Sequence, residues 1–252
     1  MALTVDFDTA SLEELLALLD HESPYVRADA ACVFGDRLRT REIDGLPTTV
    51  KSRLVEMLDD REVLPRVEAA ITLAEVHDPR ATSILLSATR SRTFRLDATR
   101  ALGAGGDAHA IPELTHLMNR WFSSWADTLQ AAAALCTLGD PGGAAFLERK
   151  LLSRRSGERA AAIHFLAECR HPRAFELLCR ILTDSKDPHR DVAARSLGLL
   201  GDPRGRDRLL TERQKADSDL ALDIDEALYR LDAGTTSARA LGSSPCSSVP
   251  LQ

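Results

Sequence analysis

The sequence has few of the residues that build β-sheets. Aromatic residues make up 4% of it, and its 10 valines and 7 isoleucines stand against 39 leucines and 36 alanines. Strands favour β-branched and aromatic side chains, whereas leucine and alanine favour helices. A large β-sheet is therefore excluded, and the composition favours an all-helical fold.

Signals for disulfides, secretion and membranes are also missing. The five cysteines are odd in number, scattered, and form no Cys-x-x-Cys pair. Residues 1–16 carry no lysine or arginine, which a secretory signal needs, and no run approaches the roughly 18 apolar residues of a membrane span. These absences predict a reduced, cytoplasmic protein without a membrane partner. Only 4 of the 32 basic residues are lysine, a skew that indicates the codon bias of a GC-rich, bacterial genome.

What the sequence contains instead is an internal repeat. A turn signal recurs at steps of 29, 33, 31 and 31 residues. Its five copies are residues 77–81 (HDPRA), 106–110 (GDAHA), 139–143 (GDPGG), 170–174 (RHPRA) and 201–205 (GDPRG). Glycine ends helices, while aspartate and proline suit the start of the next helix. Each copy therefore predicts the end of one helix and the start of another.

Three columns of residues stay in register between these turns. The first column holds a large apolar residue: Phe34, Leu73, Leu102, Leu135, Leu166, Leu197 and Leu228. Four residues earlier, the second column holds Ala30, Ala69, Ala98, Ala131, Ala162 and Ala193, then Ile224. Three residues earlier again, the third column, here called the arginine column, holds Arg27, Arg66, Arg95, Arg159 and Arg190, with Thr128 and Ala221 in repeats 4 and 7. Residues four apart share a helix face, so small alanine lets a neighbouring helix approach and the large residue fills the gap beyond it.

Each repeat carries a second apolar stripe on an earlier helix, as in Leu12, Leu15, Leu16 and Leu19 of the first repeat. One pair of helices cannot bury both stripes, so successive pairs must stack. We therefore expect an all-α fold, a right-handed α-α superhelix of about seven helical pairs over residues 11–232. Residues 1–10 form a lead-in, and residues 233–252, which are small and polar with two prolines, are expected to be a disordered tail.

The repeat follows the pattern L-x-x-L-L-x-D-x-x-x-x-V-R-x-x-A-A-x-x-L-G-x-x-x-D-P-x-A, best seen in residues 15–34 and 186–205. This pattern resembles HEAT repeats, and most of all their short class named after the phycobilin lyases. The resemblance covers about residues 11–232. It implies a HEAT-like solenoid but no particular function, because this fold serves many.

The resemblance also implies partners for the arginine column. In HEAT-like repeats this arginine pairs with an aspartate near the end of the first helix. Asp20, Asp59 or Asp60, and Asp184 stand where such partners are expected, whereas arginines occupy that place in repeats 3 and 5. Structural pairing is thus the default, and Arg95 and Arg159 are the two arginines expected to lack local partners and to be available to a ligand.

Two further groups are candidates for binding. Trp121, Phe122 and Trp125 lie between the helices of repeat 4 and include both tryptophans of the chain; such residues form binding hot spots, or fill the hydrophobic gap of a wide repeat. The position two residues before the large apolar column varies between repeats, and its candidates for a binding surface are Arg100, His164 and Arg195. The alternative is a plain solvated face.

No catalytic, cofactor or metal site is predicted. His164, Cys169 and His171 fit no standard zinc spacing. His21-Glu22 is the only His-Glu pair, whereas deoxyhypusine hydroxylase, a HEAT-like di-iron enzyme, needs several, so that activity is excluded. No Gly-x-Ser-x-Gly, P-loop or Gly-x-Gly-x-x-Gly motif occurs.

The predicted function is a non-catalytic, protein-binding scaffold, adaptor or regulatory partner that uses the concave face of the solenoid. One alternative is a tetrapyrrole attachment factor like the phycobilin lyases, with Trp121, Trp125 and Arg159 around the ligand. Another is a DNA glycosylase or nucleic-acid binder of the HEAT-like alkylpurine type, with Trp125, Asp127 and Arg159.

The distribution of charge bears on the partner. The net charge of −6 hides 19 basic and 13 acidic residues over 79–206, between acidic ends. We therefore expect a central surface that favours a protein partner with an acidic surface. A nucleic acid is less expected.

Overall fold

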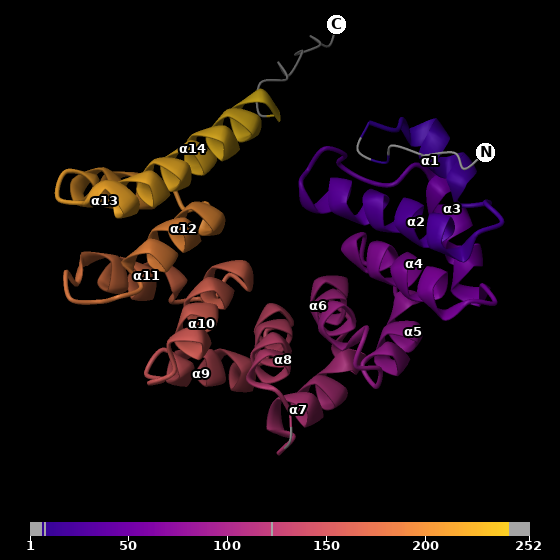
Figure 1. The fold of residues 1–252 in the computed structure, drawn as a ribbon, viewed down its shortest axis with the longest axis horizontal. Helices are drawn as coiled ribbons and strands as arrows, with labels where there is room; N and C mark the ends of the chain where they lie inside the picture. The colour runs from indigo at the N-terminus through magenta and orange to yellow at the C-terminus, as the bar shows by residue number, and fades with distance from the viewer. Residues whose placement is uncertain (1–6, 8, 122, 242–252) are drawn as a thin grey trace, which may run out of the picture. The chain divides into compact units, whose positions relative to one another are not determined.

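The chain folds entirely into helices wherever the structure describes it. The structure is a computed structural model that describes residue 7, residues 9–121 and residues 123–241. This part contains fourteen α-helices and two short 3-10 helices, with no strand (Figure 1). The α-helices follow one another as seven pairs, which confirms the predicted all-α architecture and number of repeats.

The chain divides into two compact units, Met1–Leu147 and Glu148–Gln252, called unit 1 and unit 2 below. Unit 1 contains four pairs: α1 (Leu12–Leu18) and α2 (Pro24–Arg39); α3 (Thr48–Glu56), extended by η1 (Met57–Asp59), and α4 (Val63–Glu75); α5 (Ala81–Ala88) and α6 (Arg95–Gly105); η2 (Ala108–Ala110) with α7 (Ile111–Asn119), and α8 (Trp125–Thr137). The second helices form one stack, since α2 packs on α4, α4 on α6, and α6 on α8.

Unit 2 repeats this arrangement. Its helices are the end of α9 (Pro141–Lys150), then α10 (Ser156–Glu168), α11 (Ala174–Thr183), α12 (Arg190–Leu200), α13 (Gly205–Arg213) and α14 (Ser218–Leu241). Here α10 packs on α12, and α12 on α14. Helix α14 continues to Leu241, into the segment 233–252 for which we predict a disordered tail; residues 242–252 lie outside the described residues.

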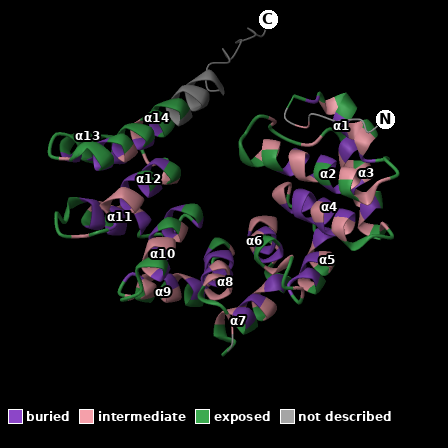
Figure 2. Ribbon diagram, in the orientation of Figure 1, coloured by how far each residue is buried: buried purple, intermediate pink, exposed green. Residues whose placement is uncertain are grey.

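The predicted columns form the core of both stacks. Buried segments run along the second helices (Figure 2). The six alanines of the second column are 0% exposed, and the first six members of the large apolar column are at most 1% exposed. Leu228, in the last pair, is half-buried. The columns were therefore assigned correctly as the buried face of each second helix.

The turn signals also act as expected. Gly106, Gly139 and Gly201 take left-handed backbone angles, with φ of 74°, 79° and 70°. Gly106 and Gly201 directly follow α6 and α12, and Gly139 follows α8 after one residue. His77 and Arg170 occupy the corresponding places with φ of 54° and 49°. Left-handed residues end helices because they let the next backbone groups turn back onto the last carbonyls.

Close approach of the second helices also depends on small residues beside the apolar column. A Cβ atom added to Gly103 of α6 would lie 2.8 Å from Cα of Ala134 in α8. Cα is a backbone atom, so the neighbouring helix itself would have to move.

We expect Gly103→Ala to reduce the free energy of unfolding by about 1–3 kcal/mol, the usual cost of overpacking a core. Gly45→Ala is the matched control, because nothing lies within 4 Å of a Cβ added there. Chemical denaturation of both variants measures the difference. Equal stability of the two would show that α6 and α8 are not in close contact.

Candidate functional site

The arginine column lies in the first turns of the second helices, and its guanidinium groups donate to backbone carbonyls at the end of the preceding helix or in the connection that follows it. Nη1 of Arg27 donates to the carbonyls of His21 and Glu22 at 2.7 and 2.9 Å. Nη1 of Arg66 likewise donates to Asp60 O (2.8 Å). In the other members Nε donates to a carbonyl: Arg95 to Thr89 O (2.9 Å), Arg159 to Leu151 O (2.7 Å) and Arg190 to Leu182 O (2.8 Å). In all members but Arg27, these bonds satisfy carbonyls that a helix end leaves without partners.

Four of the five arginines also bind a carboxylate, which comes from the next repeat. The pairs are Arg27–Asp60 (2.8 Å), Arg95–Asp127 (3.3 Å), Arg159–Asp187 and Arg190–Glu212 (3.1 Å). All eight side chains are between 8% and 19% exposed. Hydrogen bonds from Arg27 and Arg159 hold the pKa values of Asp60 and Asp187 below their ordinary range.

This arrangement corrects the predicted partners. Asp20 binds Arg53 at 2.7 Å rather than Arg27. Arg95 and Arg159, which we expected to lack local partners, each have a carboxylate from the following repeat. The arginine column therefore joins consecutive repeats within each unit, and Arg95 and Arg159 do not offer open guanidinium groups to a ligand.

The second-helix candidates lie at the surface but are largely paired. Arg100 binds Glu75 at 2.7 Å and is 25% exposed. Arg195 is 43% exposed and binds Asp223 and Asp191 at 2.6 and 2.9 Å. His164 is 52% exposed and lies 3.5 Å from Glu168. Ile71 and Ala133, in the same register as these residues, are buried, so this position does not form a continuous polar lining.

Trp121 and Trp125 are exposed. Trp121 lies in the connection between α7 and α8 and is 89% exposed; Trp125 is the first residue of α8 and is 46% exposed. The Ser124 side chain accepts a hydrogen bond from the backbone N–H of Asp127 at 3.0 Å, which fixes the start of α8. The interpretation that these tryptophans fill a gap inside repeat 4 is therefore wrong for Trp121. Phe122 lies outside the described residues.

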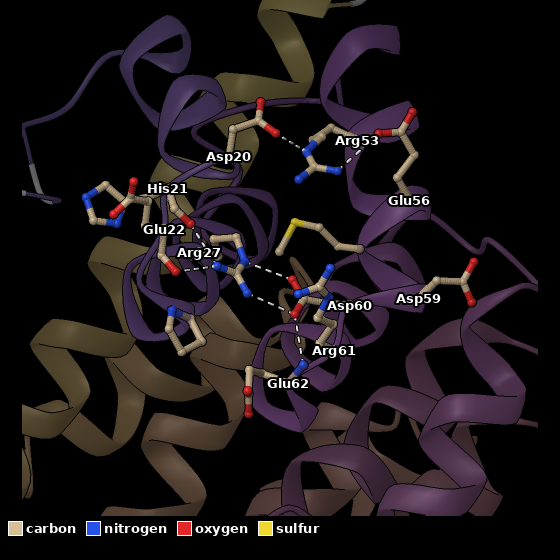
Figure 3. A pocket seen from close by; sticks show the side chains of 12 residues that line it. Asp20, His21, Glu22, Arg27, Arg53, Glu56, Asp59, Asp60, Arg61 and Glu62 are labelled. Atoms are coloured by element: carbon tan, nitrogen blue, oxygen red, sulfur yellow. Dashed lines mark hydrogen bonds and ion pairs between the residues drawn. The ribbon is translucent and has the colours of Figure 1, made fainter.

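A cavity of about 570 Å³ lies between the connections of repeats 1 and 2 (Figure 3). The Arg27–Asp60 pair lines it, and Arg53 bridges Asp20 and Glu56 across it. The sequence does not indicate this cavity, because its lining comes from two repeats. The charged groups of the cavity bind mainly one another. We therefore interpret the cavity as part of the contact between repeats 1 and 2.

The environment of Glu68 on α4 could not be recognised in the sequence either. Burial raises the pKa of Glu68 to about 7. The negative charges of Asp97, Asp36 and Asp29 raise it further, whereas the positive charge of Arg39 lowers it. The only signal in the sequence was the 17 acidic against 8 basic residues over 1–78. A sum over a segment does not show which of its charges share a face.

No described residues form a metal site. Among them, no group of three or more histidine, cysteine, aspartate or glutamate side chains could hold a metal ion. His171 is buried beside Glu148 at 3.3 Å, and burial lowers its pKa. Over the same residues, no helix is both long and apolar enough to span a membrane.

Comparison with known proteins bears on the fold. Residues 151–228 match the family model of HEAT repeats. The structure is similar to the complex of CpcE and CpcF of phycocyanin lyase from Nostoc sp. PCC7120, with a TM-score of 0.54 and 20% identity over 88% of this chain and 95% of that chain. The fold is that of HEAT repeats. The resemblance to the phycobilin-lyase class of these repeats is thus confirmed at the level of the fold.

Other comparisons add little. Human deoxyhypusine hydroxylase is 19% identical over 88% of this chain and 96% of that chain, with a TM-score of 0.36. No curated protein matches the sequence significantly.

The raised pKa of Glu68 makes stability depend on pH. Its ordinary pKa is 4.5, so between about pH 4.5 and 7 the folded protein holds a proton that the unfolded chain has lost, and stability falls as pH rises. We expect Glu68→Gln to raise the free energy of unfolding at pH 8 by about 1–2 kcal/mol, after allowance for partial exposure, and to leave it nearly unchanged at pH 4. Urea unfolding at both values tests this.

Glu22→Gln serves as the control, because Glu22 is exposed. A Glu68→Gln variant that is no more stable than the wild type at pH 8 would contradict the buried, acidic environment of this carboxyl group.

Proposed function

We propose that the protein is a non-catalytic, protein-binding scaffold, adaptor or regulatory partner. The observation that carries this proposal is the exposure of both tryptophans at one helix connection, 89% for Trp121 and 46% for Trp125. Burying such a side chain contributes about 2–3 kcal/mol, and tryptophan is enriched among the residues that dominate binding energy. HEAT-like stacks bind other proteins over extended surfaces.

The surroundings of the tryptophans favour a partner that is apolar with acidic groups at its rim. Arg120 is exposed and directly precedes Trp121. Asp127, the acidic residue closest to them along the chain, is neutralised by Arg95.

The structural comparison supports a protein partner in general terms. The phycocyanin-lyase structure is itself a complex of two proteins, CpcE and CpcF. A cytoplasmic location stays a prediction from the use of cysteine.

The tryptophan pair is tested by capture from the native source. We expect Trp121→Ala/Trp125→Ala to lose at least one partner that the wild-type protein captures, while its melting temperature changes little because Trp121 packs against almost nothing. Tyr25→Ala is the matched control: Tyr25 is 70% exposed and lies at the start of another second helix, α2.

These are the only two tryptophans in the chain, so intrinsic fluorescence reports on this site alone. Their emission should be that of a water-exposed indole and should shift to shorter wavelength when the captured partner is added. Identical partners for the wild type and the double variant would overturn the role of the pair.

A second candidate is the attachment of a tetrapyrrole, favoured by the similarity to the phycocyanin-lyase complex. The guanidinium group of Arg159, expected to hold a propionate, is bound to Asp187. Addition of a bilin would distinguish the two functions, because binding would shift its visible absorbance. No observation favours a DNA glycosylase, since Asp127 is paired with Arg95.

A further inference from the structure

Arg66 is the exception in the arginine column. Arg27 and Arg66 use Nη1 in the same way, on carbonyls six and five residues before them. In Arg27 the opposite edge of the guanidinium group, Nε and Nη2, donates to both carboxylate oxygens of Asp60 at 2.8 and 2.9 Å (Figure 3). Within the described residues, no carboxylate pairs with the corresponding edge of Arg66.

The reason lies in the sequence of the next repeat. Residues 79–96 contain no aspartate or glutamate but have arginines at 80, 90, 92 and 95. The segment that precedes the column position of the next repeat thus offers no carboxylate, and its positive charge favours an anion. A planar guanidinium edge with two N–H groups matches a carboxylate in geometry as well as in charge.

A cavity lies at the same place. Its volume is about 460 Å³, and Arg66 forms part of its wall. The other residues of the wall are six apolar ones, two serines and one acidic residue, and they include Leu58, Val67, Ile84, Phe94, Ser87 and Ser91. The acidic residue, Asp59, is exposed. A cavity whose wall combines apolar side chains with polar groups that fix orientation is typical of a ligand site of this size.

The geometry points to a binding site for a carboxylate carried by an apolar group, with the carboxylate on Nε and Nη2 of Arg66 and the apolar part against Ile84 and Phe94. The ligand takes the place that Asp60 occupies beside Arg27. Such a group is found both in a small organic acid and in an acidic segment of a protein, and the two sources share this chemistry. The site uses none of the residues of the tryptophan pair, so its failure would leave the proposed function untouched.

Isothermal titration calorimetry with three probes tests the site. Hexanoate represents the free acid, the acetylated and amidated peptide Ala-Leu-Glu-Leu represents the protein segment, and hexan-1-ol is the neutral analogue. We expect one equivalent of at least one carboxylate probe to bind to the full chain and hexan-1-ol to bind at least tenfold more weakly. Binding of hexanoate alone assigns a small acid, and binding of the peptide alone assigns a protein segment.

Three variants locate the binding. Arg66→Gln should weaken it at least tenfold. Ser91→Asp, which places a carboxylate in the cavity wall, should also weaken it at least tenfold while the fold is retained, so the test survives if Arg66→Gln is unstable. Arg92→Gln removes the same charge from an exposed neighbour outside the cavity wall and should bind like the wild type. Failure of both carboxylate probes to bind the wild type, or equal binding by Ser91→Asp, would overturn the proposal.

Discussion

The structure depends on the close stacking of its second helices. Each of these helices presents an alanine and, four residues later, a large apolar side chain, and within each unit the two columns are almost completely buried against the neighbouring pairs. Because a single pair cannot cover its own stripe, no repeat is expected to be stable alone. Alanine and glycine at the contacts set how closely the helices approach, as in the contact of Gly103 with Ala134.

The arginine column fixes the relative position of the stacked helices. An apolar face alone would tolerate small slips between neighbouring helices, whereas a guanidinium group that caps one repeat and binds a carboxylate of the next fixes their relative position. Burying a charged pair costs free energy because both groups lose their water. Here the backbone carbonyls accept further hydrogen bonds from the guanidinium group, which offsets part of this cost. The column thus has a structural role, and its one incomplete member, Arg66, is where the fold leaves an anion position open.

The sequence predicted the helix pairs well, because alanine and the large apolar residue recur at a fixed spacing that only a helix face explains. It could not predict the partners of the arginines. Asp127, Asp187 and Asp60 stand one, three and six residues before the column position of their own repeats, so the carboxylates form no column of their own. The sequence could not predict the exposure of Trp121 either, because two tryptophans in a connection give the same sequence pattern whether they are buried or exposed. Helix α14 shows a third limit, because small residues such as alanine permit helix as well as disorder.

The claim that the arginine column ties consecutive repeats together is tested most directly by a double-mutant cycle on Arg95 and Asp127, with unfolding free energies for Arg95→Ala, Asp127→Ala and the double variant. Both side chains are largely buried, at 14% and 13% exposure, so we expect a coupling energy of about 1–2 kcal/mol. The Arg195–Asp191 pair, 43% and 40% exposed, should give less than about 0.5 kcal/mol in the same experiment. A coupling for Arg95 and Asp127 as small as that of the exposed pair would contradict the role assigned to the column.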